Sequence, residues 1–250
     1  YEYSRIAADL VIKALKFNDV KSVSCKFSGN KGFHIGVPFE AFPEAIGNEK
    51  TSMMFPDAAR KIAFYIKELI KKPLGEKIMQ YENNDFSKVI EKTKENPEKI
   101  KYKASDKDGN EAYYLNAEPF LNIDTILIAS RHLYRMPYSL HEKSGLASVP
   151  IDPEKVLEFD KKNADPKSLA ISKFIFLDRK NAKNGEARKL IVQAFDLSLA
   201  KEDEIKTDPK KIYENAEAVK EENFPPCIKL INNGLSDGRK RALFVLINFL

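Results

Sequence analysis

Apolar residues recur every three to four positions over residues 5–17, and this spacing predicts an amphipathic helix. Two runs rich in apolar and β-branched residues follow, 20–27 and 33–39, and the Ser-Gly turn between them predicts a pair of strands. Asp57 is a candidate N-cap for a helix that extends to Lys72, with apolar side chains along one face. The first part of the chain is therefore expected to combine helices with a β-hairpin.

The same kinds of pattern continue in the rest of the chain. A further helix is predicted over residues 85–95, and Asp108-Gly109 is a hairpin signal between two polar strands. The run 123–129 is apolar and β-branched, which fits either a buried strand or the first turns of a helix. Asp-Pro pairs at 152–153 and 208–209 each predict a helix with proline in its first turn. The chain is thus predicted to contain both helices and strands, with no internal repeat.

Composition sets limits on the function. A chain of 250 residues can bury a core and form one large domain or two smaller ones. The formal net charge of +5 is a mild excess that does not by itself indicate nucleic-acid binding. Cys25 and Cys227 lie far apart, give no disulfide framework and suit a reducing cytoplasm. No apolar run approaches the length of a membrane span, so we expect no membrane partner.

Three parts are expected along the chain. Residues 1–160 hold most of the helix and strand signals, 161–222 are highly charged with several turn signals, and 223–250 begin a helical domain. The chain starts at Tyr1 rather than at a methionine and stops at Leu250 within an apolar helical pattern. We therefore expect it to be a piece of a longer protein.

The turn between the first two predicted strands concentrates groups that bind phosphate. Ser28 offers a hydroxyl, Lys31 an ammonium and His34 an imidazole, and the two glycines leave backbone N–H groups accessible. Such a set suits a triphosphate. Taken alone, each feature has a plainer explanation, because a Gly-x-x-Gly hairpin is commonly only a turn and a histidine on a strand is commonly part of a core.

A second segment follows about a hundred residues later. It begins with Asp124, continues through Arg131 and Arg135, and ends in Pro-Tyr-Ser-Leu-His-Glu-Lys-Ser-Gly, which contains His141 and Lys143. By themselves, the two arginines fit a solvated helix face and Lys143 fits an ordinary surface lysine. The two segments in this order, with these flanks, resemble the catalytic subunit of archaeo-eukaryotic DNA primases.

The resemblance implies a fold and an activity. The fold would be α+β, a mixed sheet flanked by helices, over residues 1–160. The activity would be synthesis of short primers on a single-stranded DNA template, in which a 3′-hydroxyl attacks the α-phosphate of a nucleoside triphosphate. Two Mg²⁺ or Mn²⁺ ions held by carboxylates would stabilise the attacking and leaving oxygens.

The resemblance also assigns residues to these roles. Asp124 would be a metal ligand and, with His34, a catalytic residue. The residues that would hold or surround the incoming triphosphate are Ser28, Lys31, His34, Arg135, His141 and Lys143.

Two departures from the family pattern concern the metal ligands. Primases carry an Asp-x-Asp pair ahead of the Ser-Gly turn, and no such pair precedes Ser28 in this chain, where Asp9 is the only nearby acid in the predicted helix. The family pattern places the pair just upstream of that helix, which is before Tyr1. The stretch from Asp124 to His141 is also one residue shorter than the family pattern.

The end of the chain carries a separate signal. Pro225-Pro226-Cys227 and the apolar run that follows resemble the start of the iron–sulfur domain of the primase large subunit. The resemblance implies that Cys227 is the first of four ligands of a 4Fe–4S cluster, with the other three beyond Leu250. The alternative is a small buried cysteine at a helix start. A cluster would imply that small-subunit and large-subunit functions are fused, or that a large subunit is the partner.

Two other functions fit the same residues. One is a module that binds nucleotides or nucleic acid without catalysis. The other is a primase-polymerase of the same superfamily that works in repair or for a mobile element.

Overall fold

The chain folds into two compact units in the computed structural model. The structure describes residues 1–105, 111–120, 135–207, 224–235, 242–243 and 245–246. Contacts divide the chain into a first unit, 1–202, and a second unit, 203–250. The first unit combines helices with small sheets, which confirms the α+β class. The expected divisions at residues 160 and 222 stay a prediction.

Two helices form the centre of the first unit. α1 spans Glu2–Phe17 as its apolar spacing predicted, and α2 spans Asp57–Tyr81. Pro56, not Asp57, is the N-cap of α2, and Asp57 instead pairs with Lys61 from the first turn. α2 also continues past the predicted end at Lys72 and through Pro73, because its apolar face continues beyond the proline with buried side chains.

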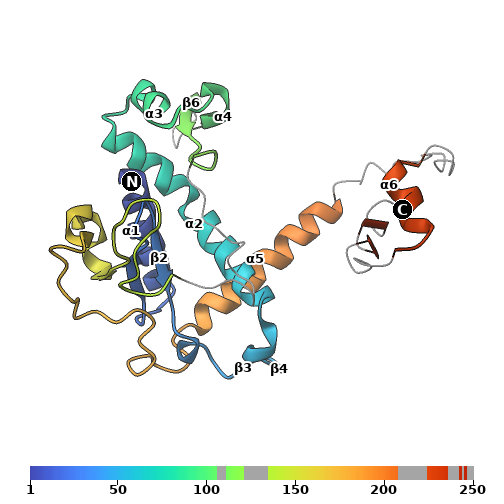
Figure 1. Ribbon diagram of the computed structural model, residues 1–250, viewed down its shortest axis with the longest axis horizontal. Helices are drawn as coiled ribbons and strands as arrows, with labels where there is room; N and C mark the ends of the chain where they lie inside the picture. The colour runs from blue at the N-terminus through green and yellow to red at the C-terminus, as the bar shows by residue number, and fades with distance from the viewer. Residues whose placement is uncertain (106–110, 121–134, 208–223, 236–241, 244, 247–250) are drawn as a thin grey trace. The chain divides into compact units, whose positions relative to one another are not determined.

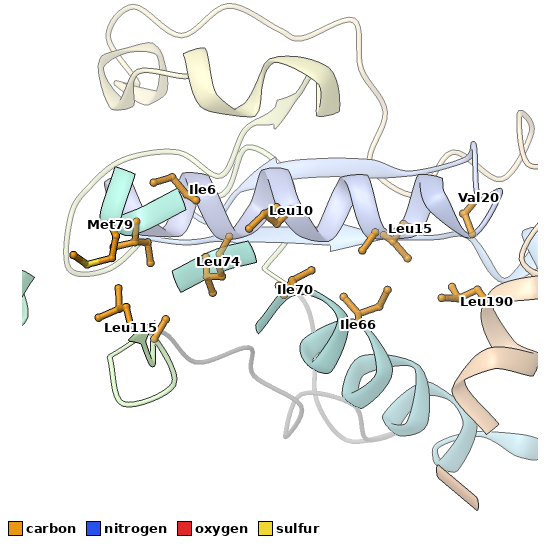
Figure 2. Packing of buried hydrophobic residues seen from close by; sticks show 14 of the residues in the cluster. Ile6, Leu10, Leu15, Val20, Ile66, Ile70, Leu74, Met79, Leu115 and Leu190 are labelled. Atoms are coloured by element: carbon orange, nitrogen blue, oxygen red, sulfur yellow. The ribbon is translucent and has the colours of Figure 1, made fainter. Parts of the chain in front are cut away.

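The main hydrophobic core lies between these helices. Figure 2 shows side chains of α1 and α2 directed toward one another, and other segments add Val20, Leu115 and Leu190 at the edges of the cluster. Gly75 permits a close approach in this core, because a Cβ there would lie 2.3 Å from the carbonyl oxygen of Leu115. Burial of this apolar surface is the main stabilising contribution to the unit.

A three-stranded antiparallel sheet packs beside α1. β1 (Ser24–Phe27) lies between β2 (Phe33–Gly36) and β7 (Pro150–Ile151). Cys25 and Phe27 of β1 enter a second core cluster with residues from α1. Because side chains alternate along a strand, Lys26 points to the opposite face of the sheet.

The other described elements surround this centre. At one end of α2 lie α3 (Phe86–Thr93), α4 (Pro97–Ile100), β5 (Lys101–Ser105) and β6 (Glu111–Leu115), whereas β3 (Ala45–Ile46) and β4 (Glu49–Lys50) lie at the other end (Figure 1). The 3₁₀ helices are η1 (Phe39–Ala41), η2 (Thr51–Met54), η3 (Pro153–Glu158) and η4 (Lys161–Ala164). The helix predicted over 85–95 is present as α3, and Asp85 is its N-cap, with its carboxylate accepting the N–H of Ser87.

The described strands form three small antiparallel sheets rather than the one mixed sheet that the resemblance implied. Hairpin connections are too short for parallel pairs, and three of the four pairings are hairpins. β5 and β6 pair as predicted on either side of 108–109, a turn that itself lies outside the described residues.

The other predicted helix starts have mixed outcomes. Asp152 caps η3, where a short 3₁₀ helix with proline in its first turn replaces the expected α-helix. The runs at 123–129 and 208–209 lie outside the described residues. α5 spans Arg188–Thr207, and in the second unit α6 spans Pro226–Asn232. Among the helices of the described residues, none is long and apolar enough to cross a membrane.

Candidate functional site

The Ser28 turn closes the hairpin between β1 and β2. The backbone N–H of Ser28 donates to the carbonyl of Gly32 at 2.9 Å, and the Ser28 hydroxyl oxygen accepts the N–H groups of Asn30 and Gly32 at 3.4 and 3.3 Å. Gly29 has a φ of +93°, which favours glycine. The hydroxyl oxygen therefore stabilises the turn as an acceptor, and its O–H remains the group that can donate to a ligand.

The second predicted segment packs directly on this turn. The Ser144 hydroxyl donates to the carbonyl oxygen of Gly29, and a Cβ on Gly29 would lie 2.9 Å from the Cβ of His141 and 3.0 Å from the Leu146 oxygen. The Ser148 hydroxyl donates to the Phe27 carbonyl at 2.8 Å. The residues 28–34 and 135–148 are thus brought together into one site, although about a hundred residues separate them in the sequence.

The second segment is held in shape by its own hydrogen bonds. The N–H of His141 donates to the Leu146 carbonyl at 2.8 Å, and the N–H of Lys143 donates to His141 Nδ1 at 3.2 Å. Because His141 Nδ1 is an acceptor, the ring proton of its neutral form lies on Nε2. The Lys143 side chain is exposed beside it.

The Arg135 side chain stabilises the segment 135–148 through hydrogen bonds within it. Its guanidinium donates to the Leu140 carbonyl at 2.8 Å and to the Glu142 carboxylate at 2.6 Å. A backbone hydrogen bond and the Arg135 contact lower the pKa of Glu142. Arg135 therefore helps to hold the segment in shape, and its contact with a nucleotide stays a prediction.

His34 lies on β2 and contacts a residue that the sequence reasoning missed. Lys26, its cross-strand partner on β1, places its ammonium 2.8 Å from His34 Nδ1. Burial, and then the neighbouring charges of Lys26 and Arg135, lower the pKa of His34 to about 4. His34 is thus neutral at pH 7, so it can act on a ligand only through hydrogen bonds and not through a charge. The signal that could have found Lys26 is a lysine between two apolar residues of a strand.

The lowered pKa of His34 predicts sensitivity to acid. Its ordinary value is 6.5, so between pH 6.5 and about 4 the unfolded chain binds a proton that the folded chain does not. We expect the contribution of neutral His34, about 1 to 2 kcal/mol after solvent screening, to be lost as the pH falls through this range. Chemical denaturation at a series of pH values, compared with His34→Gln, measures it. Parallel curves for the two proteins would contradict the prediction.

Two exposed lysines give the site its positive charge. Lys31 at the tip of the turn and Lys143 on the second segment have no ion pair within the described part of the chain. Lys161, at the start of η4, lies 4.2 Å above the ring of Tyr1. Burial and then the charge of Lys31 lower the pKa of Lys161. Two cations this close to each other favour an anion between them.

The metal ligand predicted within this chain is not among the described residues. Asp124 and Arg131 lie outside the described residues. Asp9 is buried on α1 and its carboxylate accepts hydrogen bonds from Lys13 at 2.9 Å and Lys77 at 3.1 Å, so it serves the core. Within the described ranges, three or more His, Cys, Asp or Glu side chains nowhere form a group that could hold a metal ion.

The two cysteines differ in environment. Burial raises the pKa of Cys25 to about 12, so its thiol is part of the core beneath the sheet. Cys227 lies in the first turn of α6 and is exposed, which differs from the alternative of a buried cysteine at a helix start. Its role in a cluster stays a prediction.

Two cavities lie near the other end of β1. One of about 220 Å³ is lined by Lys21, Ser24, Asp178 and their neighbours, and one of about 510 Å³ lies by Lys189 at the start of α5. Neither of these two is lined by a residue of 28–34 or 135–148. The exposed Lys31 and Lys143 place the charged groups of the candidate site at the surface, as suits a charged ligand held by cations.

Comparisons of the chain with protein-family models, with curated proteins and with solved structures give no match.

Proposed function

We propose that this chain carries the triphosphate-binding site of a DNA primase, an enzyme that joins nucleoside triphosphates into short primers on single-stranded DNA. The observation that carries the proposal is the docking of the segment 135–148 on the Ser28 turn. Primase-like motifs that are distant in the sequence share one surface, and Ser144 bonds the Gly29 carbonyl there.

The side chains of this surface suggest how a triphosphate is held. Lys31 and Lys143 supply charge from the two segments, and neutral His34 supplies an N–H. The Ser28 hydroxyl adds a further donor beside the turn. Charge-assisted hydrogen bonds to phosphate oxygens are stronger than neutral ones, so these four groups complement a triphosphate.

Metal chemistry rests on residues that the structure does not describe. Two divalent ions, Mg²⁺ or Mn²⁺, would stabilise the attacking and leaving oxygens. The described residues alone do not supply a carboxylate set for them, and Asp124 is the ligand that the resemblance assigns. The 4Fe–4S cluster at Cys227, a large-subunit partner and a cytoplasmic location belong to the same proposal.

Titration with ATP tests the binding step. In the presence of Mn²⁺, Lys31→Ala is expected to weaken ATP binding about tenfold, because it removes a phosphate contact worth roughly 1.4 kcal/mol. Lys50→Ala on β4 is the matched control, because Lys50 is also an exposed lysine and lies outside the site. Equal affinity of both variants and the wild-type chain would contradict the assigned site.

Primer synthesis separates catalysis from binding. The full-length natural polypeptide, supplied with single-stranded DNA, Mn²⁺ and labelled nucleoside triphosphates, is expected to make short products without a primer. ATP binding without synthesis would favour the non-catalytic module. Extension of a supplied primer without initiation would favour the primase-polymerase of repair or of a mobile element.

A further inference from the structure

Lys26 occupies an unusual position for a lysine. It lies in the central strand of the three-stranded sheet, between Cys25 and Phe27, and none of its surface is exposed. Its neighbours on the strand enter the core, so its own side chain lies on the opposite face with His34 and Ser148. A lysine is almost never fully buried unless its ammonium is fully bonded.

The ammonium has three N–H groups and three acceptors. It lies 2.8 Å from His34 Nδ1, donates to the Arg135 carbonyl at 2.5 Å and donates to the Ser148 hydroxyl at 3.1 Å. The Ser148 hydroxyl gives its own proton to the Phe27 carbonyl at 2.8 Å, so it can only accept from Lys26. Each of the three bonds therefore uses one lysine proton.

This arrangement determines where the His34 ring proton lies. An ammonium has no lone pair, so the short contact requires that Nδ1 accept. In a neutral imidazole the proton must then be on Nε2. The other tautomer would place an N–H of His34 against an N–H of Lys26 inside the protein, where an unmade hydrogen bond is costly.

We propose that Lys26 is a positioning residue that fixes His34 as the Nε2–H tautomer, so that the ring presents a donor and not a lone pair to a phosphate. The ligand in this statement rests on the proposed function, whereas the tautomer does not. Lys26 also joins the two segments of the site, because it bonds both β2 and the Arg135 carbonyl.

The charge on Lys26 also favours a phosphate at the outer side of the His34 ring. Its three partners are neutral, and within the described residues no carboxylate contacts it. Burial is the main cause that lowers its pKa to about 8, followed by the charge of Arg135, so it is still mostly protonated at pH 7. A buried cation without a carboxylate adds positive potential behind the His34 ring.

Nitrogen NMR of the histidine rings tests the inference directly. The chain is labelled with ¹⁵N-histidine, and His34→Gln identifies the His34 signals among those of the three histidines. The wild-type chain at pH 7 is expected to show His34 with its proton on Nε2. In Lys26→Met, which keeps an unbranched, slightly shorter side chain and removes the donors, a mixture of both tautomers is expected. Lys21→Met is the control, because Lys21 is an exposed lysine shortly before β1 in the chain.

The tautomer of His34 and the affinity for ATP, measured together, distinguish failure of this inference from failure of the proposed function. ATP affinity is expected to fall about tenfold in Lys26→Met and to stay unchanged in Lys21→Met. If the tautomer behaves as expected and no variant or wild-type chain binds ATP, the proposed function fails and the role of Lys26 stands. A wild-type His34 with its proton on Nδ1 overturns the inference, as does an unchanged tautomer in Lys26→Met. If Lys26→Met does not fold, the wild-type spectrum alone decides.

Discussion

Replacing His34 with alanine is expected to reduce primer synthesis by the full-length polypeptide at least about 100-fold, because one preorganised N–H donor in an active site is worth roughly that much. The ring is neutral and is held by Lys26 on one side, so it acts through a hydrogen bond. The alanine variant loses this donor and keeps the strand.

The control for this experiment is His34→Gln. The glutamine amide can place an N–H near the position of Nε2, so partial recovery of synthesis is expected, to within about tenfold of wild type. Circular dichroism and thermal unfolding should show that both variants fold. A folded His34→Ala variant with more than half of the wild-type activity would count against the assigned site.

A second large effect is expected from Gly29→Ala. The new side chain would sit 2.9 Å from the Cβ of His141 on a backbone with a φ of +93°, so both space and conformation oppose it. We expect a loss of about 2 to 3 kcal/mol in the free energy of unfolding. ATP binding should also be lost, because the second segment can no longer dock on the turn.

Gly32→Ala is the matched control in the same turn. Its added Cβ would approach only the Ser28 hydroxyl, at 3.9 Å, which is an ordinary contact. Thermal unfolding measures stability, and hydrogen exchange over residues 141–148 measures docking of the segment. Equal stability of the two variants would refute the argument from close packing.

The sequence predicted best what depends on neighbours in the chain. α1 and the hairpin follow from local apolar spacing and from turn residues, and both are present. The predicted N-cap of α2 was wrong, because Pro56 takes the cap position and Asp57 begins the helix. The predicted end at Lys72 was also wrong. Proline normally stops a helix, but here burial of the apolar face outweighs the hydrogen bond that Pro73 removes.

Other features depend on residues distant in the sequence. Ser28 and His34 could be selected as candidate site residues from their residue types alone. The neutral state of His34 could not be predicted from the sequence, because it results from burial beside Lys26 and Arg135. A lysine in a strand is normally predicted at the surface, and only the docked segment supplies the carbonyl and hydroxyl that make its burial possible. The pairing of β1 with β7 likewise depends on two distant segments, which local patterns do not specify.

The pairing of β1 with β7 has a consequence for the newly made protein. The hairpin 24–36 leaves the ribosome long before Pro150 and Ile151, its partners on the other side of β1. Until then Lys26 lacks two of its three acceptors, the Arg135 carbonyl and the Ser148 hydroxyl. Because domains fold as units during synthesis, a nucleotide held at the proposed site could not stabilise the first half of the chain before these later residues are made. Ligand-induced stabilisation would begin only with nascent chains that have exposed residue 151.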